Sequence, residues 1–193
     1  MRTGRAARRG GRRPDPAPRI SEPRYIDQRP AEVEGRAVPG HWEGDLVIGK
    51  AGKTAVATLV ERTSRMLILV PLTGRDSLTV GDAVIAAVKD LPAQARKTLT
   101  WDCGSEMARH KQITATAMPV YFARPHSPWQ RGSNENLNRI VREYFPKGID
   151  ITSNPDYLAT VAAEINDRPR KILGWKKPSE VFTELISSDA STD

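Results

Sequence analysis

The feature of this sequence that most restricts its fold is a change in the spacing of its apolar residues. Three short apolar segments follow one another after His41, and turn residues separate them; the segments are residues 42–48, 54–60 and 66–72. Short strand-like runs with turns between them predict an antiparallel three-strand meander. After Ser77, the expected cap, apolar residues recur at helical spacing until Pro92. The chain therefore changes from strands to helices near residue 77.

Shorter segments continue this alternation to the C-terminal end. Residues 98–101 predict a fourth strand, residues 105–117 a helix and residues 120–123 a fifth strand. Further helices are expected at residues 131–145, after the Asn154-Pro155 cap, and from Pro178. The order β-β-β-α-β-α-β indicates an α/β fold in which helices flank a five-stranded sheet.

The net charge of +7 is concentrated at the N-terminal end. Residues 1–20 contain seven arginines and one aspartate, so the remainder is close to neutral. Their Arg, Gly and Pro content predicts a disordered basic tail that either binds a polyanion or is simply solvated. We expect residues 1–30 to form this tail and a connector, residues 31–187 the core domain, and residues 188–193 a disordered C-terminus. Prolines among residues 21–40 favour an extended connector over a packed element.

Several classes of protein are excluded by what the sequence lacks. No apolar run approaches the roughly 20 residues of a membrane span, and no hydrophobic segment of a secretory signal follows the early arginines. One cysteine, Cys103, and three scattered histidines form neither an internal disulfide nor a zinc cluster. These features predict a cytoplasmic protein with no membrane partner.

Three carboxylates lie in or near the expected sheet, where acidic residues are uncommon and require an explanation. Asp45 interrupts the first strand, Asp102 closes the fourth, and Glu135 lies on a helix packed nearby. If the first and fourth strands are neighbours, the two aspartates meet. Each residue also has an ordinary explanation, namely an outward strand residue at Asp45, a turn or cap at Asp102, and a solvated helix residue at Glu135.

Taken together, the three carboxylates suit hard divalent ions, which require several oxygen ligands in one place. Two such ions about 4 Å apart stabilise both oxygens of an in-line displacement at a phosphodiester. Glycosidases also use paired carboxylates, but their sugar sites usually have an aromatic-lined groove. Aromatic residues make up only 6% of this chain, which disfavours that alternative.

Several motifs in a fixed order carry a resemblance to a known family. They lie at residues 40–50 (GHWEGDLVIGK), 59–62 (LVER), 99–107 (LTWDCGSEM), 121–136, 144–148 (YFPKG) and 166–175. With these motifs the chain resembles the catalytic core of an IS30-family transposase, within the ribonuclease H-like transposase and integrase superfamily, from about Arg29 to Phe182. The resemblance implies a ribonuclease H-like five-stranded mixed sheet and a D-D-E triad at Asp45, Asp102 and Glu135.

The resemblance also implies a reaction and its partners. Two Mg²⁺ or Mn²⁺ ions would support DNA strand cleavage that leaves a 3′-hydroxyl, followed by strand transfer to a target duplex. The partners would be transposon ends and target DNA, with a homo-oligomer assembled on the DNA. Glu106 is expected either to cap the helix that follows Asp102 or to support the metal ligands without binding the metal itself. Relatives carry N-terminal helix-turn-helix regions that residues 1–40 cannot form, so a truncated member is expected.

Polar residues around Glu135 are candidates for DNA contact. Arg131, Asn134, Asn138 and Arg142 suit the phosphate backbone, and Trp129 suits stacking on a displaced base. Ordinary helix-surface polarity and anchoring of a loop explain the same residues without DNA. Two other functions stay open, a ribonuclease H-type nuclease without strand transfer and a non-catalytic DNA-binding remnant of a transposase.

Overall fold

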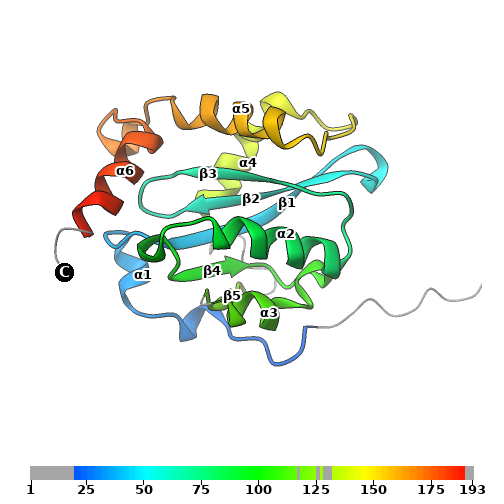
Figure 1. The fold of residues 1–193 in the computed structure, drawn as a ribbon, viewed down its shortest axis with the longest axis horizontal. Helices are drawn as coiled ribbons and strands as arrows, with labels where there is room; N and C mark the ends of the chain where they lie inside the picture. The colour runs from blue at the N-terminus through cyan, green and yellow to red at the C-terminus, as the bar shows by residue number, and fades with distance from the viewer. Residues whose placement is uncertain (1–19, 117, 125–126, 128–131, 190–193) are drawn as a thin grey trace, which may run out of the picture.

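The computed structural model describes residues 20–116, 118–124, 127 and 132–189. Its centre is one five-stranded sheet with the order β3-β2-β1-β4-β5 (Figure 1). The strands are β1 (His41–Ile48), β2 (Ala55–Glu61), β3 (Leu67–Pro71), β4 (Thr98–Trp101) and β5 (Val120–Phe122). Strands β1 to β3 pair antiparallel, whereas β4 pairs parallel with β1 and with β5. The expected five-stranded mixed sheet is confirmed.

Helices cover both faces of this sheet. They are α1 (Glu32–Gly35), α2 (Ser77–Lys89), α3 (His110–Ala115), α4 (Gly132–Tyr144), α5 (Pro155–Asn166) and α6 (Pro178–Asp189). Helices α2 and α3 pack on one face, and α4 and α5 pack on the other (Figure 1). Among the described residues, no helix combines the length and the apolar character that crossing a membrane requires.

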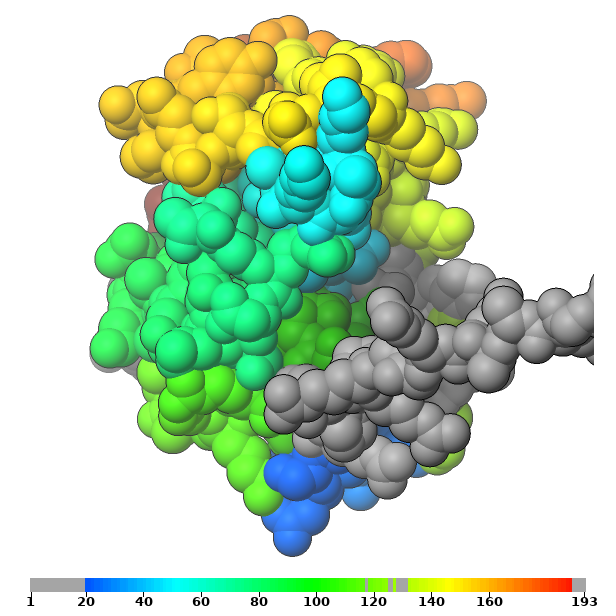
Figure 2. Space-filling view, turned by 90° about the vertical axis from the view of Figure 1, so that its right-hand side faces the viewer, coloured from blue at the N-terminus to red at the C-terminus, as the bar shows by residue number. Residues whose placement is uncertain are grey.

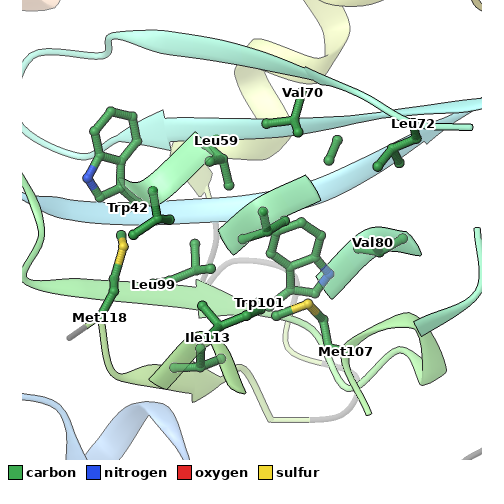
Figure 3. Packing of buried hydrophobic residues seen from close by; sticks show 14 of the residues in the cluster. Trp42, Leu59, Val70, Leu72, Val80, Leu99, Trp101, Met107, Ile113 and Met118 are labelled. Atoms are coloured by element: carbon green, nitrogen blue, oxygen red, sulfur yellow. The ribbon is translucent and has the colours of Figure 1, made fainter. Parts of the chain in front are cut away.

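Two apolar cores result from the alternation of side chains along the strands. In β2, Ala57 and Leu59 face α2, whereas Val56 and Val60 face α4 and α5. Figure 3 shows the first core, in which Trp101 lies against residues of α2 and the segment after β4. Both tryptophans of that core, Trp42 and Trp101, are completely buried. Strands β1 and β2 therefore have apolar contacts on both faces, because residues of each belong to both cores.

The N-cap that the sequence predicts is confirmed for α5 and is wrong for α2. Asn154 caps α5 and Pro155 is its first residue, as the sequence predicts, and the Asn154 side chain accepts hydrogen bonds from two backbone amides. The expected cap at Ser77 is wrong, because the side chain of Asp76 accepts from the amides of Leu78 and Thr79. Asp76 has the extended backbone that an N-cap requires, and Ser77 is already helical.

The expected helix over residues 105–117 is interrupted. A 3₁₀ turn at Ser105–Met107 precedes α3, and Arg109 between them has φ −95° and ψ 18°. Arg109 therefore lies in the bridge region, outside the α-helical one, which separates the two short helical pieces.

The segment expected to be an extended connector packs on the sheet. Tyr25 forms a parallel bridge with Phe122, and the Phe122 amide donates to the carbonyl of Arg24 at 2.7 Å. Val33 of α1 is buried. The backbone groups on the outer side of β5 would otherwise lack partners, and residues 24–25 satisfy some of them. The prolines of this segment therefore do not prevent it from packing.

Gly44 is the position in β1 at which a side chain has no space. A Cβ atom there would lie 2.1 Å from Cε3 and Cζ3 of the Trp101 ring. Because Trp101 is fully buried and cannot move away, Gly44→Ala should lower the free energy of unfolding by about 1–3 kcal/mol or more. Urea unfolding followed by tryptophan fluorescence measures this loss.

The control for this substitution is Gly35→Ala, at the end of α1. A Cβ atom at Gly35 meets nothing within 4 Å, so this variant should be nearly as stable as the unchanged chain. Equal stability of the two variants would contradict the close packing of Trp101 on β1.

Candidate active site

The register between β1 and β4 brings two aspartates together. Glu43 of β1 pairs with Thr100 of β4 in a parallel ladder. Asp45 is two residues further along β1, on the same face as Glu43, and Asp102 directly follows Trp101, the last residue of β4. The two aspartates therefore lie beside each other where β4 ends.

A cavity of about 570 Å³ lies at this position, and both aspartates line it. Its charged lining further includes Asp76, Glu106 and Arg75, so four carboxylates face one guanidinium. The end of the molecule at which β1 finishes faces the viewer in Figure 2, where the β1–β2 turn is cyan. Such an excess of negative charge repels a phosphodiester unless cations occupy the cavity.

Hydrogen bonds fix the orientation of Asp45. Its Oδ1 accepts from the Leu46 amide, and its Oδ2 accepts from Nδ2 of Asn138 on α4, both at 2.9 Å. The Thr58 hydroxyl lies 3.0 Å from Oδ1 of Asn138, which turns the amide nitrogen of Asn138 toward Asp45. Asp102 Oδ1 accepts from the Gly104 amide at 3.2 Å, which holds the turn after β4.

Glu106 belongs to the same cavity. Its Oε1 accepts from the Trp101 indole at 3.2 Å, and its side chain is half-buried. Burial, together with the charges of Asp102 and Asp45, raises the pKa of the Glu106 carboxyl above its ordinary value. The sequence predicts only a cap or a supporting role for Glu106, yet the structure places its carboxylate in the cavity that both aspartates line.

Glu135, the third expected carboxylate, lies on α4, which packs on β1 and β2. Its side chain is exposed, and it is not among the described residues that line the cavity. Within the described ranges, no three His, Cys, Asp or Glu side chains form a group arranged to hold a metal. The structure thus brings Asp45 and Asp102 together and leaves Glu135 apart from them.

The residues expected to contact DNA differ in their burial and in the groups that they contact. Asn134 is fully buried, and its Oδ1 lies 3.0 Å from the Thr58 hydroxyl, so its side chain supports the fold. Arg142 is half-buried and donates to the carbonyl of Phe145 at 3.3 Å. Asn138 contacts Asp45, as described above. Trp129 and Arg131 lie outside the described residues.

Sequence reasoning missed a buried ion pair beneath the site. Glu43 is 0% exposed, and its Oε1 lies 2.5 Å from Nη1 of Arg62, which is also buried. Its Oε2 accepts from the Asn134 amide at 2.9 Å, in the first turn of α4. The available signal was Glu43 itself, a charged residue that shares a strand face with Asp45.

The donor set of the cavity fits a hard divalent ion. Mg²⁺ is usually held by one or two carboxylates, with water and substrate phosphates as its other ligands. Asp45 and Asp102 supply two such carboxylates, and the acidic lining favours cation entry. No sulfur or imidazole side chain is among the described residues that line the cavity, which disfavours softer metals.

Comparison with known proteins identifies related sequences. Residues 35–128 match the family described as integrase core domain. Over 164 residues the chain is 45% identical to "Transposase InsI for insertion sequence element IS30A" of Escherichia coli (strain K12), covering 84% of this chain and 43% of that protein. It is 43% identical over 165 residues to "Transposase for insertion sequence element IS1086" of Cupriavidus metallidurans, covering 84% and 49% respectively.

A solved structure shares the fold. The catalytic core domain of BIV integrase superposes with a TM-score of 0.58 at 16% sequence identity, covering 78% of this chain and 98% of that one. The identity is too low to compare more than the fold. The chain spans less than half the length of the two transposases named above.

Proposed function

We propose that this chain, which belongs to the integrase core domain family and within it to the IS30-type transposases, is a catalytic core that cuts and joins DNA strands. The observation that carries the proposal is the parallel register of β1 and β4, which brings Asp45 and Asp102 to one acidic cavity. Carboxylate pairs at such a position suit divalent ions, and phosphodiester chemistry needs the positive charge that those ions provide.

In this proposal the two aspartates hold Mg²⁺ or Mn²⁺, and two ions are expected. When bound, the ions stabilise the attacking and leaving oxygens of an in-line displacement at phosphorus. Asn138 keeps Oδ2 of Asp45 in place through its amide, and Thr58 in turn orients Asn138. These hydrogen bonds hold the carboxylate of Asp45 in one orientation, as hydrogen bonds to metal ligands usually do.

Glu135 is the third ligand of the proposed triad, because the family resemblance assigns this part to the glutamate of the motif at residues 121–136. Helix α4 carries it, and the Asn134 amide next to it is held by Glu43. Glu106 is the alternative third carboxylate, since it already lines the cavity with both aspartates. One oxygen of Glu106, Oε1, already accepts from the Trp101 indole, which suits a supporting part better than that of a metal ligand.

The domain organisation and partners are part of the same proposal. Residues 31–187 would form the catalytic core, and the arginines of residues 1–20 would contact phosphates without reading sequence. Transposon ends and a target duplex would be the substrates of a homo-oligomer assembled on DNA. These statements concern whole transposases, of which the matched segment is less than half.

A strand-transfer assay tests the proposed function. The chain is incubated with a labelled oligonucleotide duplex that already has a recessed 3′-hydroxyl end, and with an unlabelled target duplex. Joined products are expected with Mg²⁺ or Mn²⁺ and none after exhaustive chelation, whereas Ca²⁺ should allow DNA binding with little turnover.

Each other outcome of this assay supports a different function. Shortened strands without joined products would indicate a ribonuclease H-type nuclease. Binding with neither product would indicate a non-catalytic remnant. Joined products that persist after chelation would overturn the metal assignment.

A further inference from the structure

A second cavity, of about 270 Å³, lies beside the first turn of α4, at the end of the sheet where β2 finishes. Three guanidinium groups line it, from Arg36 after α1, Arg65 in the β2–β3 turn and Arg170 after α5. The described lining contains no carboxylate. Three distant parts of the chain thus converge to place positive charge in one cavity.

These three arginines have little compensation from the protein. In the part of the chain that the structure describes, none of them forms an ion pair. Arg170 has a buried Nε without a hydrogen-bond partner, and Arg65 donates to the hydroxyl of Ser133. Burial and the neighbouring charge of Arg36 both lower the pKa of Arg65. An anion in the cavity would offset this unfavourable crowding of like charges.

The nearest carboxylates are occupied by other partners. Glu43 pairs with Arg62 and accepts from the Asn134 amide, as described above. Glu61 accepts from the amide of Gly40 and from the amide and hydroxyl of Ser64. Both glutamates still act on Arg65 through their charge, but neither of them lines the cavity.

The local backbone brings two of the arginines to the start of α4. Gly132 and Ser133 begin this helix and line the cavity, whereas the next amide, that of Asn134, already donates to Glu43. Arg36 and Arg65 have φ of 49° and 65°, a left-handed conformation that favours glycine. Long cationic side chains occupy both positions although the backbone there favours glycine.

We propose that this cavity binds a backbone phosphate of the DNA on which the carboxylate site acts. The inference rests on the proposed function for the identity of the ligand. In the β1–β2 ladder, Val60 of the cavity pairs with Glu43, and Thr58 pairs with Asp45. Helix α4 links the two sites, because its Asn136 lines the arginine cavity and its Asn138 donates to Asp45 of the carboxylate cavity. A DNA strand that runs along α4 would therefore reach both. Arginine forks match phosphate geometry in two-point contacts.

Salt-dependent DNA binding tests this phosphate site. Anisotropy of a labelled random duplex is measured between low and moderate salt without divalent ions, in an Asp102→Asn background so that chemistry plays no part. Arg65→Met and Arg170→Met should each weaken binding about tenfold at 0.1 M salt and lower the salt slope by about 0.9, similarly for every duplex sequence.

Two further variants separate loss of the site from general effects. Arg109→Met removes the same charge from a half-buried arginine beside α2, on the opposite face of the sheet, and should change affinity less than twofold. Arg65→Lys keeps the charge and should retain the salt slope even if the contact with Ser133 is lost. Thermal unfolding confirms that each variant is folded before it is titrated.

The remaining outcomes decide the proposal and the source of the phosphate. Cavity variants that behave like Arg109→Met would overturn the site. A further outcome is that inorganic phosphate stabilises the unchanged chain but not Arg65→Met, while the salt slope of DNA binding stays the same in both. That result would assign the cavity to a free phosphate and overturn its role on DNA. If the cavity variants lower the salt slope of DNA binding but the unchanged chain forms no joined products, the phosphate site would be supported and the proposed function rejected.

Discussion

Asp102→Asn should reduce strand transfer at least about 100-fold while leaving DNA binding within about twofold, because it removes a metal-binding charge worth several kcal/mol. The substitution keeps the size of the side chain and a carbonyl oxygen that can accept from the Gly104 amide. The fold around the turn after β4 should therefore persist. Product formation is measured with pre-cut ends in Mg²⁺, and duplex affinity by anisotropy in Ca²⁺.

The matched control is Asp76→Asn, the same chemical change in the same cavity. Asp76 caps α2, and asparagine caps helices about as well as aspartate does. This variant should keep most of the activity and most of the stability. If Asp102→Asn retained more than about a tenth of the activity, the assignment of the triad would be wrong.

The two glutamates are distinguished in the same assay. Glu135→Gln should be as inactive as Asp102→Asn, and Glu106→Gln should retain substantial activity, because a glutamine oxygen can still accept from the Trp101 indole as Oε1 of Glu106 does. The opposite pattern would identify Glu106 as the third ligand, in agreement with its place in the cavity of both aspartates.

The sequence predicted the structure correctly where the spacing of apolar residues reflects the burial of a whole helix or strand. The change from strands to helices near residue 77 predicted the sheet and its flanking helices because alternation and helical spacing follow directly from burial. The meeting of Asp45 and Asp102 followed from one assumption, that β1 and β4 are neighbours, and the parallel ladder satisfies it. Their juxtaposition is thus a consequence of the strand order, which the structure supplies.

The sequence was insufficient where single contacts between distant residues decide the structure. Either Asp76 or Ser77 could have capped α2, since both side chains accept from helix amides, and only the backbone angles separate them. The packing of residues 24–25 on β5 depends on an edge that no local pattern reveals. The position of Glu106 depends on the Trp101 indole that holds it. The three cavity arginines, far apart in sequence, carried no common signal.

The second large effect concerns the ion pair between Glu43 and Arg62. Arg62→Met should lower the free energy of unfolding by about 3–5 kcal/mol, because it leaves the fully buried carboxylate of Glu43 without its cationic partner. Domains of this size have a total stability of about 5–15 kcal/mol, so the loss is a large fraction of it. Urea unfolding followed by the buried Trp42 and Trp101 measures the change.

The surface pair of Arg168 provides the matched control. Arg168 lies 3.0 Å from Glu143 and 3.1 Å from Glu164, with its side chain 39% exposed. Because solvent screens these charges, Arg168→Met should cost less than about 1 kcal/mol. If both arginine variants lost the same stability, burial would not be the cause of the effect.

The double variant Arg62→Met with Glu43→Gln decides whether the cost comes from the unpaired charge. A neutral glutamine can still accept from the Asn134 amide, which Glu43 Oε2 does at 2.9 Å, so the first turn of α4 should stay attached to β1. The double variant should therefore regain more than half of the stability lost by Arg62→Met alone, a coupling expected of residues in contact. A double variant less stable than Arg62→Met would mean that the charge of Glu43 itself anchors α4. In that case the carboxylate, acting on the positive end of the helix, would hold α4 and Glu135 against the strand that carries Asp45.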